Sequence, residues 1–349
     1  MKKEIYLIAL SFLSFFALKA QDTKAKVEYK VVGIGFYNVE NLYDTIDQAN
    51  LDEEFLPKGK KNYTSAVYKD KLGKLSDVIS QLGKEVTKDG LALMGMGEVE
   101  NKAVIEDLVR QPKLADKNYQ VIHYDSPDAR GVDVALIYQP RFFTPIHSQP
   151  IRLNQTNESG NYRATRDILY VKGLLDNDTI HVLVNHWPSR RGGQAASEKY
   201  RMDAAKYCKN ISDSLMKVNP EAKIFVMGDL NDDPVNKSCA EIMAARGDKK
   251  DVLQGNFYNP MWKFYKAGIG TLAYDDAWNL FDQIMISYGT LNEKNGGYHY
   301  YKTRIFNEPF LTQKSGAYKG YPHRTFIGDR YDGGYSDHFP VYLFFVKPI

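Results

Sequence analysis

The segment IFVMGDLNDDP, residues 224–234, decides how this chain can fold. Its first four residues form a short apolar run typical of a buried strand, and Pro234 prevents that strand from continuing. Asp229 and Asn231 lie where the predicted strand ends. Alone, the segment is an adequate turn signal, because Asp and Asn side chains bond to their own backbone.

The same arrangement recurs along the chain, with polar side chains at the ends of apolar runs. They are Asn38 and Glu40 after Val31–Tyr37, Glu98 and Glu100 after Leu91–Met96, Asn185 and His186 after Val182–Val184, Asp282 before Ile284–Ile286, and Asp337 and His338 before Val341–Val346. One polar terminus predicts a turn or a helix cap. Six indicate that these side chains converge, since sites are assembled at strand ends.

Periodicity predicts a mixed α+β sandwich in a single catalytic domain over residues 31–347. Strands are expected at Val31–Tyr37, Leu91–Met96, Val132–Tyr138, Ile168–Leu174, Ile180–Asn185, Ile224–Met227, Gln283–Ser287 and Val341–Val346. Helical faces run from Tyr68 to Leu82 and from Tyr200 to Leu215. The strands between residues 132 and 185 follow one another without helices, which argues against an all-parallel sheet. Residues 255–335, rich in Gly and Tyr, predict long loops and short hairpins.

Composition excludes disordered, collagen-like and multi-span membrane proteins: the 349 residues include 46 Lys and Arg, 43 Asp and Glu, and 43% apolar residues. Lys2 and Lys3 precede an apolar run to Leu18, which predicts a signal peptide of residues 1–20; an uncleaved anchor is the alternative. Export to the periplasm or the exterior, without a membrane anchor after cleavage, is therefore expected. The mature chain is nearly neutral, so bulk attraction to polyanions is not predicted. The sequence predicts no protein partner.

Two cysteines, Cys208 and Cys239, leave open whether a disulfide forms, because the sequence does not show whether they approach. The count excludes a zinc site built on thiolates. The polar strand ends instead offer carboxylates, amides and two imidazoles. Hard oxygen ligands of this kind suit Mg²⁺ or Mn²⁺ and a phosphate substrate.

These residues resemble the motifs of the endonuclease/exonuclease/phosphatase superfamily. The motifs are Asn38 in Tyr-Asn-Val-Glu-Asn, Glu98 in Gly-Glu-Val-Glu, Asn185-His186, Gly228-Asp229-Leu230-Asn231, Phe281-Asp282-Gln283-Ile284 and Ser336-Asp337-His338. They follow the family order from about Val31 to Val346. The resemblance implies a four-layer α/β/β/α sandwich with two mixed β-sheets.

The resemblance also implies roles for these residues. Glu98 would be the main ligand of Mg²⁺ or Mn²⁺, with Asn38 and Asp337 beside it. His338 would act at the reacting phosphate, oriented by Asp282, either to activate water or to stabilise the phosphate. Asp229 would position the attacking water or a second metal. Asn231 and His186 would donate hydrogen bonds to the phosphoryl oxygens.

Structural alternatives stand beside these roles: Asn38 could cap the segment after the first strand, and His186 could be a packed loop histidine. A second set of residues could bind substrate phosphate or simply form solvated basic surface: Arg130, Arg190 and Arg191. Asp133, near the start of a predicted strand, could reach His186 and orient it.

The sequence favours a secreted, metal-dependent hydrolase of phosphodiester bonds, with a nuclease acting on DNA or RNA as the leading interpretation. The basic loop at Arg190 and Arg191 and the Tyr-rich loops of residues 255–335 could hold a nucleic-acid backbone and a base. A lipid or sugar phosphodiesterase or phosphatase of the same fold is the alternative. A non-catalytic binding module would predict gaps at the metal and histidine positions, and the motifs show none.

Overall fold

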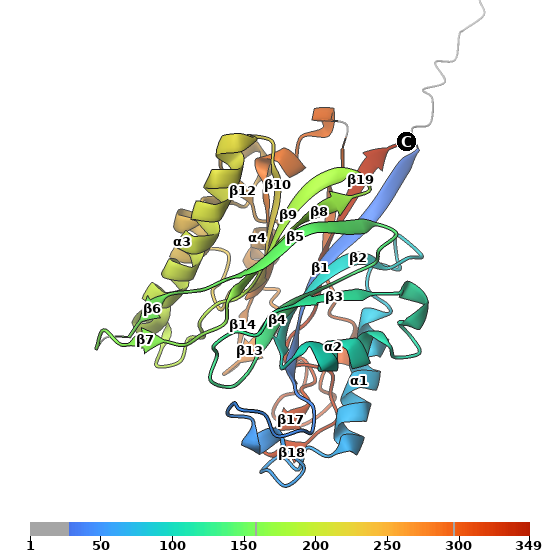
Figure 1. Cartoon of the computed structure of the whole chain (residues 1–349), viewed down its shortest axis with the longest axis vertical. Helices are drawn as coiled ribbons and strands as arrows, with labels where there is room; N and C mark the ends of the chain where they lie inside the picture. The colour runs from blue at the N-terminus through green and yellow to red at the C-terminus, as the bar shows by residue number, and fades with distance from the viewer. Residues whose placement is uncertain (1–27, 158, 296) are drawn as a thin grey trace, which may run out of the picture.

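Two mixed β-sheets form the framework of the chain in this computed structural model, which describes residues 28–157, 159–295 and 297–349 (Figure 1). Across the first sheet the strands are β16 (His299–Ile305), β19 (Val341–Pro348), β1 (Tyr29–Leu42), β2 (Leu91–Val99), β4 (Asp133–Tyr138) and β3 (Gln120–His123). Across the second they are β11 (Ala245–Arg246), β12 (Phe257–Tyr258), β15 (Asp282–Ser287), β10 (Lys223–Asp229), β9 (Asp178–His186), β8 (Ile168–Leu175) and β5 (Phe143–Ile151). Each sheet therefore contains one of the central pairs of parallel strands, β1 with β2 and β9 with β10.

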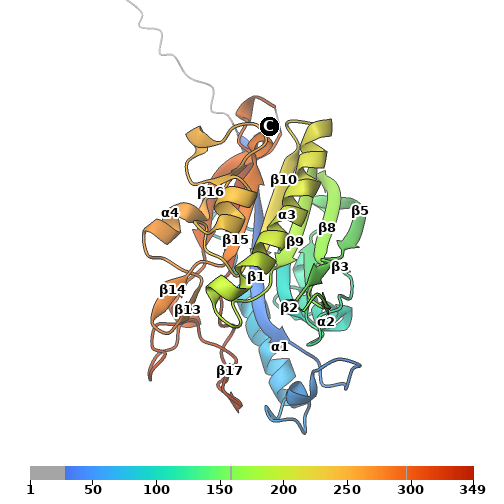
Figure 2. The same ribbon diagram turned by 90° about the vertical axis from the view of Figure 1, so that its left-hand side faces the viewer.

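Helices cover the outer faces of both sheets. They are α1 (Ser65–Ile79), α2 (Lys102–Val109), α3 (Gln194–Val218) and the short α4 (Met261–Lys266). Leu72 and Leu75 of α1 belong to the main hydrophobic core, which also contains the side chains packed between the two sheets. Ala204 and Cys208 of α3 belong to a second core on the outer face of β8, β9 and β10. Figures 1 and 2 show α3 and α1 on opposite sides of the sheets. The predicted four-layer α/β/β/α sandwich is confirmed.

All eight predicted strands are present, but five edge or near-edge strands escaped prediction: β3, β5, β16 and the two-residue strands β11 and β12, which are too short to give a pattern. β3, β5 and β16 border the sheets and leave many side chains in solvent. Edge strands bury little apolar surface, so their sequences lack a clear apolar pattern. The loop-rich region of residues 255–335 contains the predicted short hairpins, β13 (Leu272–Tyr274) with β14 (Ala277–Asn279) and β17 (Phe326–Ile327) with β18 (Arg330–Tyr331). A third small hairpin pairs β6 (Gln155–Thr156) with β7 (Tyr162–Arg163).

The sequence leaves open the signal peptide at the N-terminus and the disulfide between Cys208 and Cys239. The predicted signal peptide, residues 1–20, lies outside the described residues. Within the described ranges, no helix combines the length and apolar character needed to cross a bilayer. Cys208 and Cys239 are both buried and free, so they form no disulfide.

Candidate active site

The six polar strand ends meet at one end of the two packed sheets. In the second sheet, Asp229 of β10 lies opposite His186 of parallel β9 and opposite Asp282 of antiparallel β15. In the first sheet, Asn38 of β1 lies beside the end of β2 that carries Glu98. The antiparallel strands β15 and β19 begin where their neighbours end, which brings their first residues to the same edge. The convergence that the sequence predicts is therefore present.

Local backbone geometry aims several of these side chains. Glu98, Glu40 and Asn231 all adopt left-handed conformations, with φ values of 61°, 52° and 50°. Such conformations are disfavoured for residues other than Gly and cluster at functional sites. Gly228 is needed for another reason: a Cβ atom there would lie 2.1 Å from the carbonyl oxygen of Asn185. The motif glycine thus lets β9 and β10 approach closely.

His338 and Asp282 form a buried pair. The distance from His338 Nδ1 to Asp282 Oδ2 is 2.7 Å, and the opposite ring nitrogen, Nε2, lies 3.9 Å from Asp229 Oδ2. When Nδ1 donates to Asp282, the ring is held with Nε2 turned toward Asp229. The sequence-based role of Asp282 as the orienting partner of His338 remains a prediction, and this geometry supports it.

The two site histidines differ in charge. Burial lowers the pKa of His338, but the carboxylates of Asp282, Asp229 and Asp337 outweigh this effect and raise it well above the ordinary value. Burial lowers the pKa of His186 far below its ordinary value, and Arg166 and Arg130 add to that shift. The fold alone therefore favours a charged His338 beside a neutral His186.

Asp229 lies at the centre of the site. It accepts hydrogen bonds from Asn38 Nδ2 at 3.1 Å and from the backbone N–H of Asn231 at 3.0 Å, and its Oδ2 lies 3.5 Å from His186 Nε2. Burial is the main cause that raises the pKa of Asp229 to about 6. A carboxyl with such a pKa can take a proton from water near neutral pH. The Asn231 amide donates to the carbonyl of Trp187 at 2.9 Å, so it also fixes the segment that carries His186.

The predicted metal ligands offer hard oxygen atoms on the same edge. Glu98 accepts from the Asn41 backbone through Oε2, while its Oε1 lies 3.9 Å from His186 Nε2. Asp337 is partly exposed and pairs with Arg324 at 3.2 Å. Together with the side-chain oxygen of Asn38, this set fits Mg²⁺ or Mn²⁺. Elsewhere in the described ranges, His123, Asp125 and Asp133 each place one possible ligand atom within 4.8 Å of the other two.

Asp133 does not orient His186, contrary to expectation. Its carboxylate bonds to His123 Nε2 at 3.0 Å and to Ser126. The segment of His186 is held instead by Arg166, which donates to the carbonyls of His186 and Trp187 and pairs with Asp128. An arginine just before a strand, as Arg166 is in the sequence, does not by its position reveal this role.

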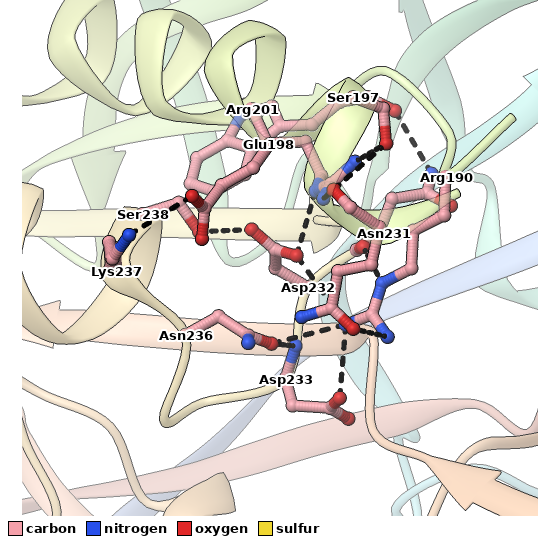
Figure 3. A network of polar contacts seen from close by, with 12 residues as sticks. Arg190, Ser197, Glu198, Arg201, Asn231, Asp232, Asp233, Asn236, Lys237 and Ser238 are labelled. Atoms are coloured by element: carbon pink, nitrogen blue, oxygen red, sulfur yellow. Dashed lines mark hydrogen bonds and ion pairs between the residues drawn. The ribbon is translucent and has the colours of Figure 1, made fainter. Parts of the chain in front are cut away.

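Arg190 is built into the fold, as Figure 3 shows. Its guanidinium donates to the carbonyl of Asn231 at 2.9 Å, to Asp233 at 3.0 Å and to Asn236 at 3.1 Å. It also lies 4.3 Å from the centre of the Phe281 ring. Because its donors already serve the chain, Arg190 is poorly placed to bind phosphate. The neighbouring Arg191 is exposed.

Arg130 lies at the rim of the site. Its side chain is about half exposed and lies 3.5 Å from Asp128. Burial lowers the pKa of Arg130, but the charges of Glu98 and Asp128 raise it overall. The influence of Glu98 on this pKa indicates that the Arg130 guanidinium lies near the predicted metal ligand.

Sequence reasoning gave no role to Lys71 and Glu40, two buried titratable residues that both bond to Thr325. Lys71 of α1 is fully buried and donates to Thr325 Oγ1 at 2.6 Å, and Glu40 accepts from the Thr325 backbone at 2.7 Å. Burial and the charge of Asp337 raise the pKa of Glu40 to about 7. Glu40 belongs to the Tyr-Asn-Val-Glu-Asn motif, so its sequence position could have indicated a place near the site. Lys71 lies inside an amphipathic helix and gave none.

A small cavity of about 110 Å³ opens beside Asp337. It is lined by Ala273, Tyr274, Asp275, Gln313, Tyr318, Tyr321, Pro322, Arg324, Ile327 and Asp337. A second cavity, of about 300 Å³, shares Arg324 and Asp337 and extends to Lys61 and Phe326. The Tyr-rich loops predicted from sequence therefore border the strand-end site.

Comparison with known proteins gives one family and a consistent fold. The family model of the Endonuclease/Exonuclease/phosphatase family matches residues 33–347.

Among solved structures, a family protein from Bacteroides thetaiotaomicron is 15% identical, with coverage of 93% of this chain and 98% of its own and a TM-score of 0.56. D. rerio TDP2 complexed with single-strand DNA product is 12% identical, covering 90% and 98%, with a TM-score of 0.53. A mannosyl-6-phosphatase of Bacteroides thetaiotaomicron is 15% identical, covering 89% and 98%, with a TM-score of 0.54. At these identities the likeness shows the fold alone. A search of curated protein sequences finds no match.

Proposed function

This chain belongs to the Endonuclease/Exonuclease/phosphatase family, and we propose that it is a divalent-metal-dependent hydrolase of phosphodiester bonds that acts on nucleic acid. Members of this family are metal-dependent phosphoester hydrolases. The observation that carries the proposal is the convergence of Asp229, Glu98 and the pair His338–Asp282 at one end of the two sheets. A fold without this chemistry would not need four such groups on one edge.

The metal site is proposed from the donor atoms. Glu98, Asn38 and Asp337 would hold Mg²⁺ or Mn²⁺. When bound, the ion supplies positive charge that neutralises the phosphoryl oxygens and makes the phosphorus easier to attack.

The protein's own residues supply the remaining steps. Asp229, with its pKa raised to about 6, positions a water molecule and takes its proton. His338, held by Asp282, and neutral His186 donate N–H groups to the phosphoryl oxygens as charge develops there. Asn231 acts beside them and also holds the His186 segment through Trp187.

Nucleic acid is the preferred substrate class because aromatic side chains flank the site. Tyr274, Tyr318 and Tyr321 line the cavity that reaches Asp337, and Tyr274 is 71% exposed. Exposed rings stack on bases without strong sequence preference. Arg324 in the same cavity and Arg130, which is influenced by Glu98, would contact backbone phosphates.

A sugar phosphate is the second candidate, because the cavity beside Asp337 is small and is lined by both polar and aromatic side chains. Gln313, Asp275 and Arg324 offer hydrogen bonds to hydroxyl groups, and tyrosine rings pack against the apolar face of a sugar. Such a substrate would be a phosphate monoester or a compact diester.

Hydrolysis by the mature chain tests both candidates. Plasmid DNA, bis-p-nitrophenyl phosphate and p-nitrophenyl phosphate should be compared with Mg²⁺, Mn²⁺ or EDTA, beside Glu98→Ala. Metal-dependent DNA cleavage that is lost in the variant would support the nuclease. Cleavage of only the small esters would favour the second candidate, and an inactive but folded protein would contradict hydrolase function.

We also propose that the chain is exported after cleavage near Ala20. The support is the pair Lys2 and Lys3 followed by an apolar run that is too short to span a bilayer comfortably. N-terminal sequencing of the protein from a secreting host tests this. An intact Met1 in the recovered protein would contradict it.

A further inference from the structure

The cavity of about 300 Å³ beside Asp337 connects the strand-end site with a largely buried lysine. Part of its lining adjoins the predicted metal ligands: Asp337 is one of them, and the backbone N–H of Asn41 donates to Glu98 at 3.0 Å. Lys61 lines the same cavity, and its side chain is 14% exposed. A positive charge therefore lies inside a cavity that adjoins the strand-end site.

A compact turn holds the backbone of Lys61 in place. The N–H of Lys61 donates to the carbonyl of Glu54 at 3.1 Å. On either side of Lys61, the N–H groups of Gly59 and Tyr63 both donate to the carbonyl of Leu56, at 2.9 and 3.2 Å. The position from which the Lys61 side chain starts is thus set by the fold.

Two aromatic rings hold the ammonium group of the same side chain. Lys61 Nζ lies 5.3 Å from the centre of the Phe55 ring and 5.2 Å from the centre of the Phe326 ring, both within the range of a cation–π contact. Both rings are buried. The charge therefore has a fixed place before a ligand binds, which reduces the entropy lost when an anion is bound.

The Lys61 ammonium group keeps donors for a ligand. It carries three N–H groups, and the one hydrogen bond that it makes to the described residues is to the carbonyl of Gly328 at 3.1 Å. Glu54 and Asp329 lie 3.9 and 3.8 Å away, beyond hydrogen-bond distance. Their side chains are 49% and 62% exposed, so water screens both charges. Lys61 can therefore donate to an anion that enters the cavity.

The two carboxyl groups in the lining of this cavity have partners of their own. Glu40 accepts from the Thr325 backbone at 2.7 Å, and Asp337 lies 3.2 Å from Arg324. Arg324 lines both cavities beside Asp337. The cavity therefore offers an anion two cations, Arg324 beside Asp337 and Lys61 beside Gly328.

We propose that Lys61 binds a second phosphate of the substrate, the one next to the phosphate that is hydrolysed. The proposal rests on the proposed function, which places the first phosphate at Glu98 and Asp337. In a polynucleotide one nucleoside separates consecutive phosphates, and a cavity of about 300 Å³ is large enough for one nucleotide residue. The substrate class is then a strand with at least two neighbouring phosphates, and Lys61 determines specificity through binding.

Paired p-nitrophenyl esters test this proposal with the mature chain in Mg²⁺. Thymidine 5′-(p-nitrophenyl phosphate) and thymidine 3′-(p-nitrophenyl phosphate) should each be compared with the form that carries a second phosphate on the other hydroxyl. In one of the two pairs we expect the second phosphate to lower KM at least about 10-fold, because a hydrogen bond between charged groups is among the stronger ones. Since this contact is the same in the ground state and the transition state, kcat should stay within about 3-fold.

Side-chain variants assign this preference to one lysine. Lys61→Met keeps an unbranched apolar stem between the rings of Phe55 and Phe326 but removes the charge, and it should abolish the preference. The control Lys58→Met removes an exposed charge from the same loop and should keep the preference. A folded Lys61→Met protein that still prefers the second phosphate would overturn the proposal, and so would an equal loss in Lys58→Met.

Binding in EDTA separates this proposal from the proposed function, and it still decides whether a second phosphate is bound if Lys61→Met fails to fold. Calorimetry should show that thymidine 3′,5′-bisphosphate binds the wild type at least about 10-fold more tightly than either thymidine monophosphate. If it does and no ester is hydrolysed, the second phosphate site stands and the hydrolase proposal is wrong. If the esters are hydrolysed but the second phosphate improves neither KM nor binding, the hydrolase proposal stands and the role of Lys61 is wrong.

Discussion

Two halves of one turn, residues 229–233, use the same residue types in opposite ways. Asp229 and Asn231 face the strand-end site, where the partners of Asp229 are an amide, a backbone N–H and two histidines. Asp232 faces Arg201, which is fully buried and lies 2.7 Å away, and Asp233 faces Arg190 (Figure 3). The second half is a closed network whose charges are balanced within the chain. Under the proposed function, the first half leaves charge for a metal ion and a substrate. Mutations in the first half should therefore reduce activity, whereas mutations in the second half should reduce stability.

Removing the metal ligand should give the largest effect on activity and almost none on stability. Glu98→Gln keeps the shape of the side chain but loses the charge that would hold the metal. We expect a fall in kcat of about 10³-fold, the upper range for loss of one electrostatic contact in an active site. Steady-state hydrolysis of bis-p-nitrophenyl phosphate measures it. A Tm lowered by many degrees would instead assign Glu98 to the fold.

Removing Asp232 should have a large effect on stability, in contrast to the loss of activity expected for Glu98→Gln. Asp232→Ala leaves Arg201 buried without its carboxylate, which should cost about 3–5 kcal/mol of unfolding free energy. Urea denaturation measures this cost. Asp203→Ala is the control, because Asp203 is a partly exposed acid on the same helix as Arg201; it should change stability by less than about 0.5 kcal/mol. Equal losses in the two variants would contradict the closed network.

A buried histidine outside both halves provides a pH test. Burial, assisted by Lys172, lowers the pKa of His181 to about 4, and its Nδ1 lies 2.8 Å from the Tyr170 hydroxyl. The unfolded chain therefore takes up this proton at higher pH than the folded chain. Stability is complete above about pH 6.5 and declines toward pH 4, by about 2 kcal/mol between pH 7 and pH 5.

Urea denaturation at those two pH values checks this decline. The variant His181→Phe should show a smaller decline than the wild type, because it removes the titrating group. An unchanged pH dependence in His181→Phe would assign the decline to other groups, such as those of the strand-end site.

The smallest expected effect is a difference in stability between variants of the adjacent Arg190 and Arg191. Arg190→Ala should lower stability by about 1–2 kcal/mol through loss of its hydrogen bonds and its contact with Phe281, whereas Arg191→Ala should stay within about 0.5 kcal/mol. Denaturation curves and KM values for both variants decide the question. A raised KM with unchanged stability in Arg190→Ala would restore its sequence-based role in phosphate binding.

The sequence predicted best the strands that are buried and the polar residues that recur at their ends. The central strands β1, β2, β9 and β10 were found because buried strands carry continuous apolar runs, and the site residues were found because a polar residue after such a run is unusual. The edge strands β3, β5 and β16 were missed because solvent-facing strands lack that pattern. Arg190 was given a substrate role because a basic loop after His186 looks the same whether its guanidinium points outward or inward.

The sequence by itself determined the family, the four-layer sandwich and the set of polar groups at the strand ends, because these depend on local pattern and on motif order. Only the tertiary structure decided which charges are balanced within the chain. It paired Asp133 with His123 and turned Arg190 and Arg201 toward Asp232 and Asp233. The physical reason is that the energy of a charge depends on its burial and on the distance to its neighbours, and those neighbours are often distant in the sequence.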